Sequence, residues 1–95
     1  MNAIPARLTE GEGLIRAVEE AVEGLGRCRD VLRVYLGIAR SRPSSVIIAL
    51  IAEVCRLLGA EVPRSVAGVL NGLDPYTREE VRRSAERIAR SCMET

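Results

Sequence analysis

Apolar residues recur at alternating steps of four and three along the first part of the chain. A repeat of this kind places side chains on one stripe of an α-helix, as in the a and d positions of a heptad. Thr9 and Glu12 have the spacing of a capping box, which marks a helix start. We therefore expect a flexible N-terminus over residues 1–8 and a helix over residues 9–40. The stripe consists of Leu14, Val18, Ala21, Leu25, Cys28, Leu32, Tyr35 and Ala39.

The stripe keeps its phase across Gly24, Leu25 and Gly26, which favours one long helix over a hairpin. At about 1.5 Å per residue, such a helix is about 45 Å long. Each glycine costs about 1 kcal/mol relative to alanine inside a helix, so we expect a kink, and the alternative is a break at these glycines. An unbroken helix of this length needs a partner to cover its stripe.

The segment SVIIALIAEVCRLLG, residues 45–59, is apolar on nearly every side. Pro43 and Gly59 are suitable residues for the start and the end of a helix. A bilayer span needs about 20 apolar residues, so we expect a central, protein-covered helix over residues 43–59. Its two charges, Glu53 and Arg56, are three apart; we expect them at an exposed edge, and the alternative is a buried ion pair at a site.

Two further helices are predicted, over residues 62–72 and 75–93. Asn71 and Gly72 end the first, and Asp74 or Thr77 caps the second. Strand-like alternation and internal repeats are absent from the sequence. The fold class we predict is all-α: one domain over residues 1–95, a small bundle of three to four helices in which a long N-terminal helix packs on the buried central helix.

The composition is that of a folded chain, with 47% apolar and 28% charged residues among 95. All fourteen basic residues are arginine, and lysine, histidine and glutamine are absent. This bias fits a thermophile. Histidine is the usual general base near neutral pH and the commonest metal ligand, and lysine forms Schiff bases, so the chain cannot use either residue for this chemistry. We expect no enzyme, no catalytic residue, no metal, no cofactor and no small-molecule substrate.

Three cysteines, Cys28, Cys55 and Cys92, lie far apart and form no C-x-x-C pair. We expect buried thiols, because each occupies an apolar-face position. The alternative is one disulfide plus a free thiol, which intracellular proteins of hyperthermophiles allow. The stretch MNAIPARLTEGEG has no apolar core of a signal peptide, so we expect a cytoplasmic location.

Charge is divided along the predicted first helix: residues 10–23 carry a net charge of −4, and residues 27–42 carry +4. The helix dipole acts only over the outer turns. Two antiparallel copies would place each acidic half against a basic half. We therefore predict a non-enzymatic interaction module that forms an antiparallel homodimer, or binds a protein partner within a larger assembly. The expected interface is the stripe from Leu14 to Tyr35 together with Glu19, Glu23, Arg29 and Arg33.

Residues 51–72 carry a second pattern: Cys55 within a helix, Gly59 in the turn, Val62 after it, and Val-Leu-Asn at residues 69–71. This resembles the helix-turn-helix of lac-repressor-type regulators, although the turn is one residue longer than standard. The resemblance implies a DNA-binding regulator that reads DNA with residues 63–71, which is our alternative function. The net charge of +1 supplies no general attraction to DNA. The expected DNA contacts are Arg64, Ser65, Asn71, Arg78, Arg82 and Arg83.

Overall fold

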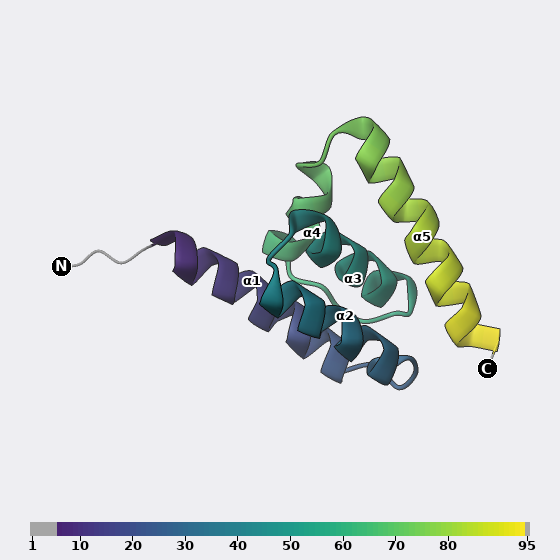
Figure 1. The fold of residues 1–95 in the computed structure, drawn as a ribbon. Coiled ribbons are helices and arrows are strands. Elements are labelled where there is room, and N and C mark those ends of the chain that lie inside the picture. The colour runs from purple at the N-terminus through teal and green to yellow at the C-terminus, as the bar shows by residue number, and fades with distance from the viewer. Residues whose placement is uncertain (1–5, 95) are drawn as a thin grey trace.

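The computed structural model describes residues 6–94 of the chain, with side chains from residue 13 onward. Of the predicted flexible N-terminus, residues 1–5 lie outside the described residues, and residues 6–8 belong to a helix. Over residues 6–94 every regular element is a helix, so the all-α prediction is confirmed, with five helices in place of three or four (Figure 1). They are α1 Ala6–Glu23, α2 Arg29–Ser41, α3 Ser45–Leu57, α4 Arg64–Asn71 and α5 Pro75–Glu94.

Helix α3 lies at the centre and packs against each of the other four helices. Its sequence is apolar around most of its circumference, and the side chains of Ile51, Val54 and Cys55 are fully buried. Each large aliphatic side chain buried in this way contributes about 1.5–3 kcal/mol. Ser44 caps the helix, since its Oγ accepts a hydrogen bond from the backbone N–H of Ile47. Among the described residues, no helix combines the length and the apolar character needed to cross a bilayer.

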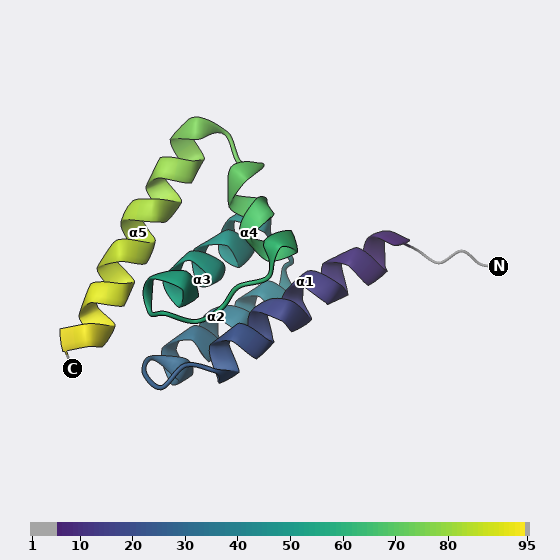
Figure 2. The ribbon, with the colours of Figure 1, turned by 180° about the vertical axis from the view of Figure 1, so that it is seen from behind.

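The unbroken helix predicted over residues 9–40 is wrong. Helix α1 ends at Glu23, the chain reverses, and α2 runs back beside α1 from Arg29 (Figures 1 and 2). The two glycines of the turn weaken helix propagation, and Cys28 adopts a left-handed conformation with φ 62°. The apolar stripe keeps its phase across the turn without a continuous helix, because Leu25 in the turn and Leu32 in α2 are both buried in the same core.

The predicted helix start at Thr9 is also wrong. Helix α1 begins at Ala6, so Thr9 and Glu12 lie inside it. Residues 6–8 are alanine, arginine and leucine, which are strong helix formers. The helix therefore extends one turn earlier than the capping pattern indicates.

Helices α4 and α5 correspond to the helices predicted over residues 62–72 and 75–93. The connection over residues 58–63 contains Gly59 at φ 94°, a left-handed conformation that suits glycine. Helix α5 lies along α3 (Figures 1 and 2). The Asp74 carboxylate accepts a hydrogen bond from the backbone N–H of Thr77 at 3.1 Å, which caps α5. The residues that α5 buries are Val81, Ala85, Ala89 and Cys92.

Candidate functional site

The acidic and basic halves of the first 42 residues meet inside one chain. The guanidinium of Arg33 donates hydrogen bonds to both carboxylate oxygens of Glu23, at 3.0 and 2.9 Å. Arg40 pairs with Glu19 one to two turns further along. The hydrogen bond from Arg33 holds the pKa of the Glu23 carboxyl below its ordinary value, although both groups face solvent. The antiparallel arrangement that the charges predict is therefore made by α1 and α2 of the same molecule.

The stripe predicted as a dimer interface is largely covered by the chain itself. Val18, Ala21, Leu25 and Leu32 are at most 7% exposed and belong to the core. Leu14 and Tyr35 are partly buried against that core. Arg29 donates from its Nε to the carbonyl oxygen of Leu25, at 3.2 Å. Because α1 and α2 cover one another, this stripe no longer requires a second chain.

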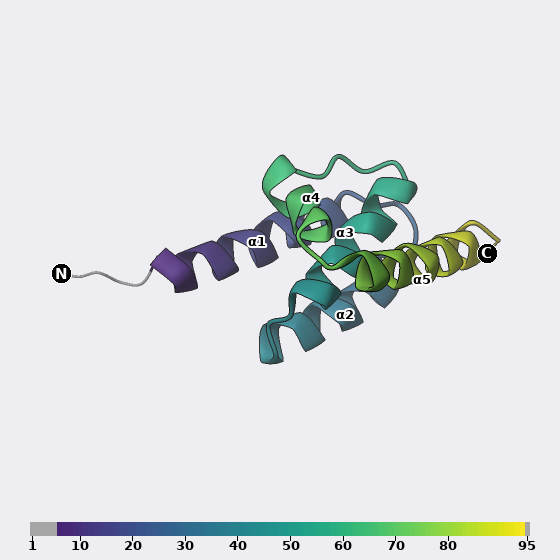
Figure 3. The ribbon, with the colours of Figure 1, turned by 90° about the horizontal axis from the view of Figure 1, so that it is seen from above.

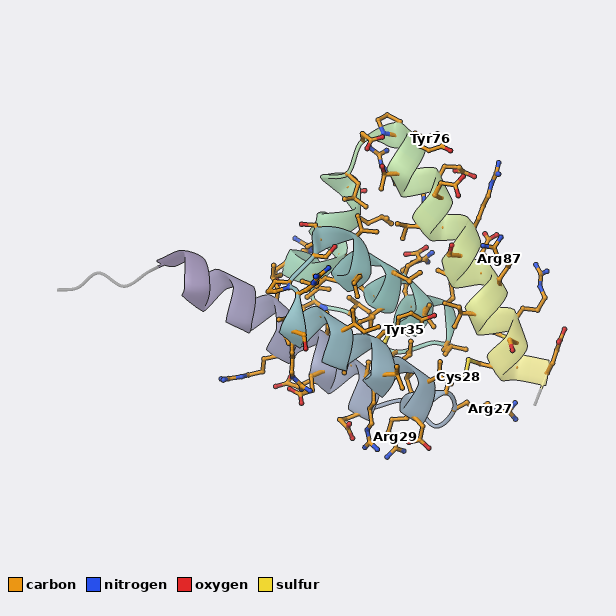
Figure 4. The ribbon with its side chains drawn as sticks, in the orientation of Figure 1. Arg27, Cys28, Arg29, Tyr35, Tyr76 and Arg87 are labelled. Carbon is orange, nitrogen blue, oxygen red and sulfur yellow. A yellow bond between two sulfur atoms is a disulfide. The ribbon has the colours of Figure 1, made fainter. Side chains whose placement is uncertain are left out.

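The cysteines follow the alternative that we kept open. Cys28, at the start of α2, and Cys92, near the end of α5, form a disulfide with their Cα atoms 5.7 Å apart (Figure 4). The expectation of three buried thiols is wrong for this pair, since the α1–α2 turn brings Cys28 to the end of α5. Cys55 is a buried free thiol. Burial raises its pKa to about 11, so it stays protonated and unreactive near neutral pH.

Glu53 and Arg56 form an ion pair at one side of α3. The guanidinium of Arg56 donates to both carboxylate oxygens, at 3.0 and 2.6 Å. This hydrogen bonding raises the pKa of Arg56 above its ordinary value. We predicted that both side chains lie at an exposed edge of the helix. This prediction is confirmed for Arg56, whose side chain is 59% exposed, and is wrong for Glu53, whose side chain is only 9% exposed. Both residues line a cavity of about 220 Å³ between α3, α4 and α5.

The residues expected to contact DNA lie in four different settings. Arg64, Ser65 and Asn71 are exposed on α4. Arg78 is turned toward its own backbone, because its Nη2 donates to the carbonyl oxygen of Leu73 at 3.1 Å. Arg82 is exposed at the rim of the cavity between α3, α4 and α5. Arg83 lies 3.4 Å from Glu79 in an exposed ion pair. A six-residue connection, residues 58–63, joins α3 to α4, whereas a standard helix-turn-helix uses about three or four residues.

The side of α2 that points away from the core carries a separate apolar surface, which we call the outer face of α2 and define by Val31, Val34 and Ile38. The three residues are spaced three and four apart, so they share one side of the helix. They are 47%, 65% and 44% exposed. Figure 3 shows α2 at an edge of the molecule.

This clustering distinguishes the outer face from ordinary exposed hydrophobic residues. Among the described residues, the other large apolar side chains with high exposure are Val46, Tyr76 and Met93. These three belong to α3 and to opposite ends of α5, and Tyr76 is at the far end from the disulfide (Figure 4). Single scattered apolar residues are normal on a protein surface, whereas large contiguous apolar patches are typical of interaction sites.

The sequence contained a signal for the outer face that the prediction missed. Val31, Val34 and Ile38 have helical spacing of their own. The predicted long helix places its apolar stripe at the neighbouring positions Leu32, Tyr35 and Ala39 and does not include this second stripe. The helix therefore carries one apolar stripe that is buried and one that is exposed.

Comparison with protein-family models, with curated proteins and with solved structures finds no match to this chain.

Proposed function

We propose that the protein is a non-enzymatic helical interaction module that forms a homodimer through the outer face of α2. The observation that carries this proposal is the exposure of Val31, Val34 and Ile38 on one side of a helix. Removing this apolar surface from water favours association, at about 25 cal/mol per Å². The sequence predicted a homodimer through the first helix, but that stripe is covered and its divided charges pair within one chain. The homodimer proposed here uses the outer face of α2 instead.

The composition supports a second copy of the chain as the partner. The net charge is only +1, so two copies repel one another weakly. A chain of 95 residues also buries a smaller fraction of its surface than a larger domain does, and a second copy adds to that burial. Binding to a different protein, as a subunit of a larger assembly, is the competing outcome.

Chemical considerations support a non-enzymatic role. The chain has neither histidine nor lysine, and the free thiol of Cys55 has a pKa of about 11. A thiol with this pKa is a poor nucleophile near neutral pH, because the thiolate is the reactive form. The location predicted from the sequence, the cytoplasm, stays a prediction; a disulfide is compatible with it in hyperthermophiles.

Size exclusion with light scattering tests the proposal on two matched variants. Val34→Glu places a charge in the outer face, and Tyr76→Glu places the same charge on an apolar residue that is 75% exposed at the start of α5. We expect wild type and Tyr76→Glu to have twice the chain mass of 10.3 kDa, and Val34→Glu to be a monomer with unchanged circular dichroism. A monomeric wild type, or a dimer that survives Val34→Glu, contradicts the proposal.

DNA binding remains the alternative, and one feature of the fold favours it. Gly59 occupies the connection between α3 and α4 in a left-handed conformation, and α4 presents Arg64, Ser65 and Asn71 to solvent. Titration of mixed duplex DNA at several salt concentrations separates the two functions. Binding that weakens steeply with salt and is lost in Arg64→Ala supports the regulator, and the absence of binding at low salt removes it.

A further inference from the structure

Gly37 lies in the middle of α2, beside the outer face, three residues after Val34 and one before Ile38. Glycine inside a helix is disfavoured relative to alanine. A Cβ built at Gly37 meets no atom within 4 Å, and the backbone of this helix needs no left-handed conformation there. The packing of the described residues therefore gives no reason for the missing side chain. Close approach of another backbone is a use that glycine serves well.

Each end of α2 has one exposed charged side chain that its own chain leaves largely available, Asp30 at the start and Arg42 just after the end. The neighbouring Arg29 and Arg40 are held by Leu25 and Glu19 of the same chain. The side chain of Asp30 is 95% exposed, and its contact with Arg33 is 3.4 Å long. Arg42 follows the last residue of α2, is exposed, and makes no ion pair with residues 13–94. A parallel second helix would bring like charges together at both ends, whereas an antiparallel one pairs Asp30 with Arg42.

One register satisfies both the apolar and the charged pairing. Asp30 and Arg42 are each six residues from position 36, and Val34 and Ile38 are each two residues from it. A two-fold axis near this position therefore places Val34 of one copy over Ile38 of the other, and Asp30 near Arg42. Interfaces with two-fold symmetry are self-complementary in this way.

We propose that the second copy lies antiparallel on α2 and crosses it at Gly37, with Asp30 of each copy facing Arg42 of the other. This inference rests on the proposed homodimer and adds its orientation and its point of closest approach. Packed helices are about 8–10 Å apart, depending on the side chains at the contact. Gly37 permits the short end of that range.

Alanine substitution at two glycines tests the crossing point. Gly37→Ala and Gly68→Ala each add a methyl group to an exposed helical position where a Cβ meets no atom within 4 Å, in α2 and α4 respectively. We expect both variants to raise the melting temperature of the dilute monomer, since alanine favours the helix. Only Gly37→Ala should weaken the dimer, raising its Kd about tenfold because the methyl group overfills a close contact. A Gly37→Ala dimer as tight as wild type overturns the crossing point.

Charge exchange tests the orientation. Asp30→Arg and Arg42→Asp should each raise the Kd by about threefold or more, and the double variant should restore it, since an exposed ion pair contributes up to about 1 kcal/mol. In a parallel dimer the double variant places like charges together again and does not restore affinity. Suppose that Val34→Glu breaks the wild-type dimer, but the double variant Asp30→Arg with Arg42→Asp binds no more tightly than either single charge variant. This result overturns the orientation and leaves the proposed function standing. A monomeric wild type overturns both.

Discussion

Helices α2 and α5 both face outward, yet their outer surfaces differ in composition. Between Glu79 and Arg90 the exposed positions of α5 are charged, and the label of Arg87 in Figure 4 marks one of them pointing away from the molecule. The corresponding side of α2 carries Val31, Val34 and Ile38. The side of a helix that contacts solvent usually carries polar residues, as in α5. This difference supports the proposed dimer contact on the outer face of α2. The exposed charged residues of α5 include Glu79, Arg82, Arg83, Glu86, Arg87 and Arg90.

The two helices are also held in place differently. Helix α2 packs against α1 and α3 and pairs its arginines with Glu19 and Glu23. Helix α5 packs along α3 and is joined to the start of α2 by the Cys28–Cys92 disulfide. Arg27 adds a hydrogen bond from its Nη1 to the carbonyl oxygen of Met93, at 3.3 Å. The C-terminal end of α5 is therefore joined covalently to the start of α2 in addition to its packing on α3.

Loss of the disulfide should produce the largest change in stability. The bridge joins residues 64 positions apart, and closing a loop of that length in the unfolded chain stabilises the fold by about 4 kcal/mol in the chain-entropy model. We expect reduction, or Cys92→Ser, to lower the free energy of unfolding by about that amount, measured by urea denaturation. The variant Cys55→Ala keeps the bridge and should retain the full response to reductant. An unfolding midpoint that reductant leaves unchanged contradicts the role of the bridge.

Truncation on the two sides of α2 should separate its inner and outer faces. Leu32 is fully buried, and Leu32→Ala should cost about 3 kcal/mol of unfolding free energy through the cavity that it leaves. Val34 is 65% exposed, so Val34→Ala should change the stability of the dilute monomer by less than about 0.5 kcal/mol. The same Val34→Ala variant should weaken the dimer. Equal losses of monomer stability in the two variants would remove the distinction between the faces.

Acid should weaken the contact between α1 and α2 slightly. The folded-state pKa of Glu23 lies below its unfolded value because Arg33 hydrogen-bonds the carboxylate. The resulting stabilisation is present above the unfolded pKa and is lost as pH falls through the folded pKa. We expect wild type to lose more stability than Glu23→Gln between about pH 7 and about pH 3, by chemical denaturation. The pKa of Asp74 is also lowered, by its hydrogen bonds with Thr77. Because wild type and Glu23→Gln both contain Asp74, its contribution cancels in the comparison of their pH profiles. Identical pH profiles would exclude the Glu23–Arg33 pair as a source of the pH dependence.

The sequence was informative where local signals and burial agree. Residues 43–59 are apolar around the helix and are bounded by Ser44 and Gly59, so both the position and the central placement of α3 follow from the sequence. The divided charge of the first 42 residues led us to predict antiparallel pairing between two chains, whereas Arg33 and Arg40 pair with Glu23 and Glu19 of their own chain. The heptad pattern does not separate the two cases, because it is the same for a long rod and for a hairpin whose turn residue is buried, as Leu25 is.

Other features depend on contacts between distant parts of the chain. The burial of Glu53 results from α4 and α5 packing over one side of α3, which the periodicity of α3 alone does not contain. The disulfide requires Cys28 to reach Cys92, and only the reversal of the chain after α1 brings the two together. The spacing of Val31, Val34 and Ile38 in the sequence places them on one side of α2. That this side is exposed follows only from the structure, in which Leu32 and Leu36 form the buried side.

Nuclear magnetic resonance on a dilution series compares the two outward-facing helices residue by residue. Backbone amide shifts that change with protein concentration report which residues enter the dimer contact. The account predicts changes confined to α2, centred on Val34, Gly37 and Ile38, with the amides of α5 around Glu86 unchanged. Concentration-dependent changes centred on α5, or no changes on α2 up to millimolar concentration, would contradict a homodimer formed through the outer face of α2.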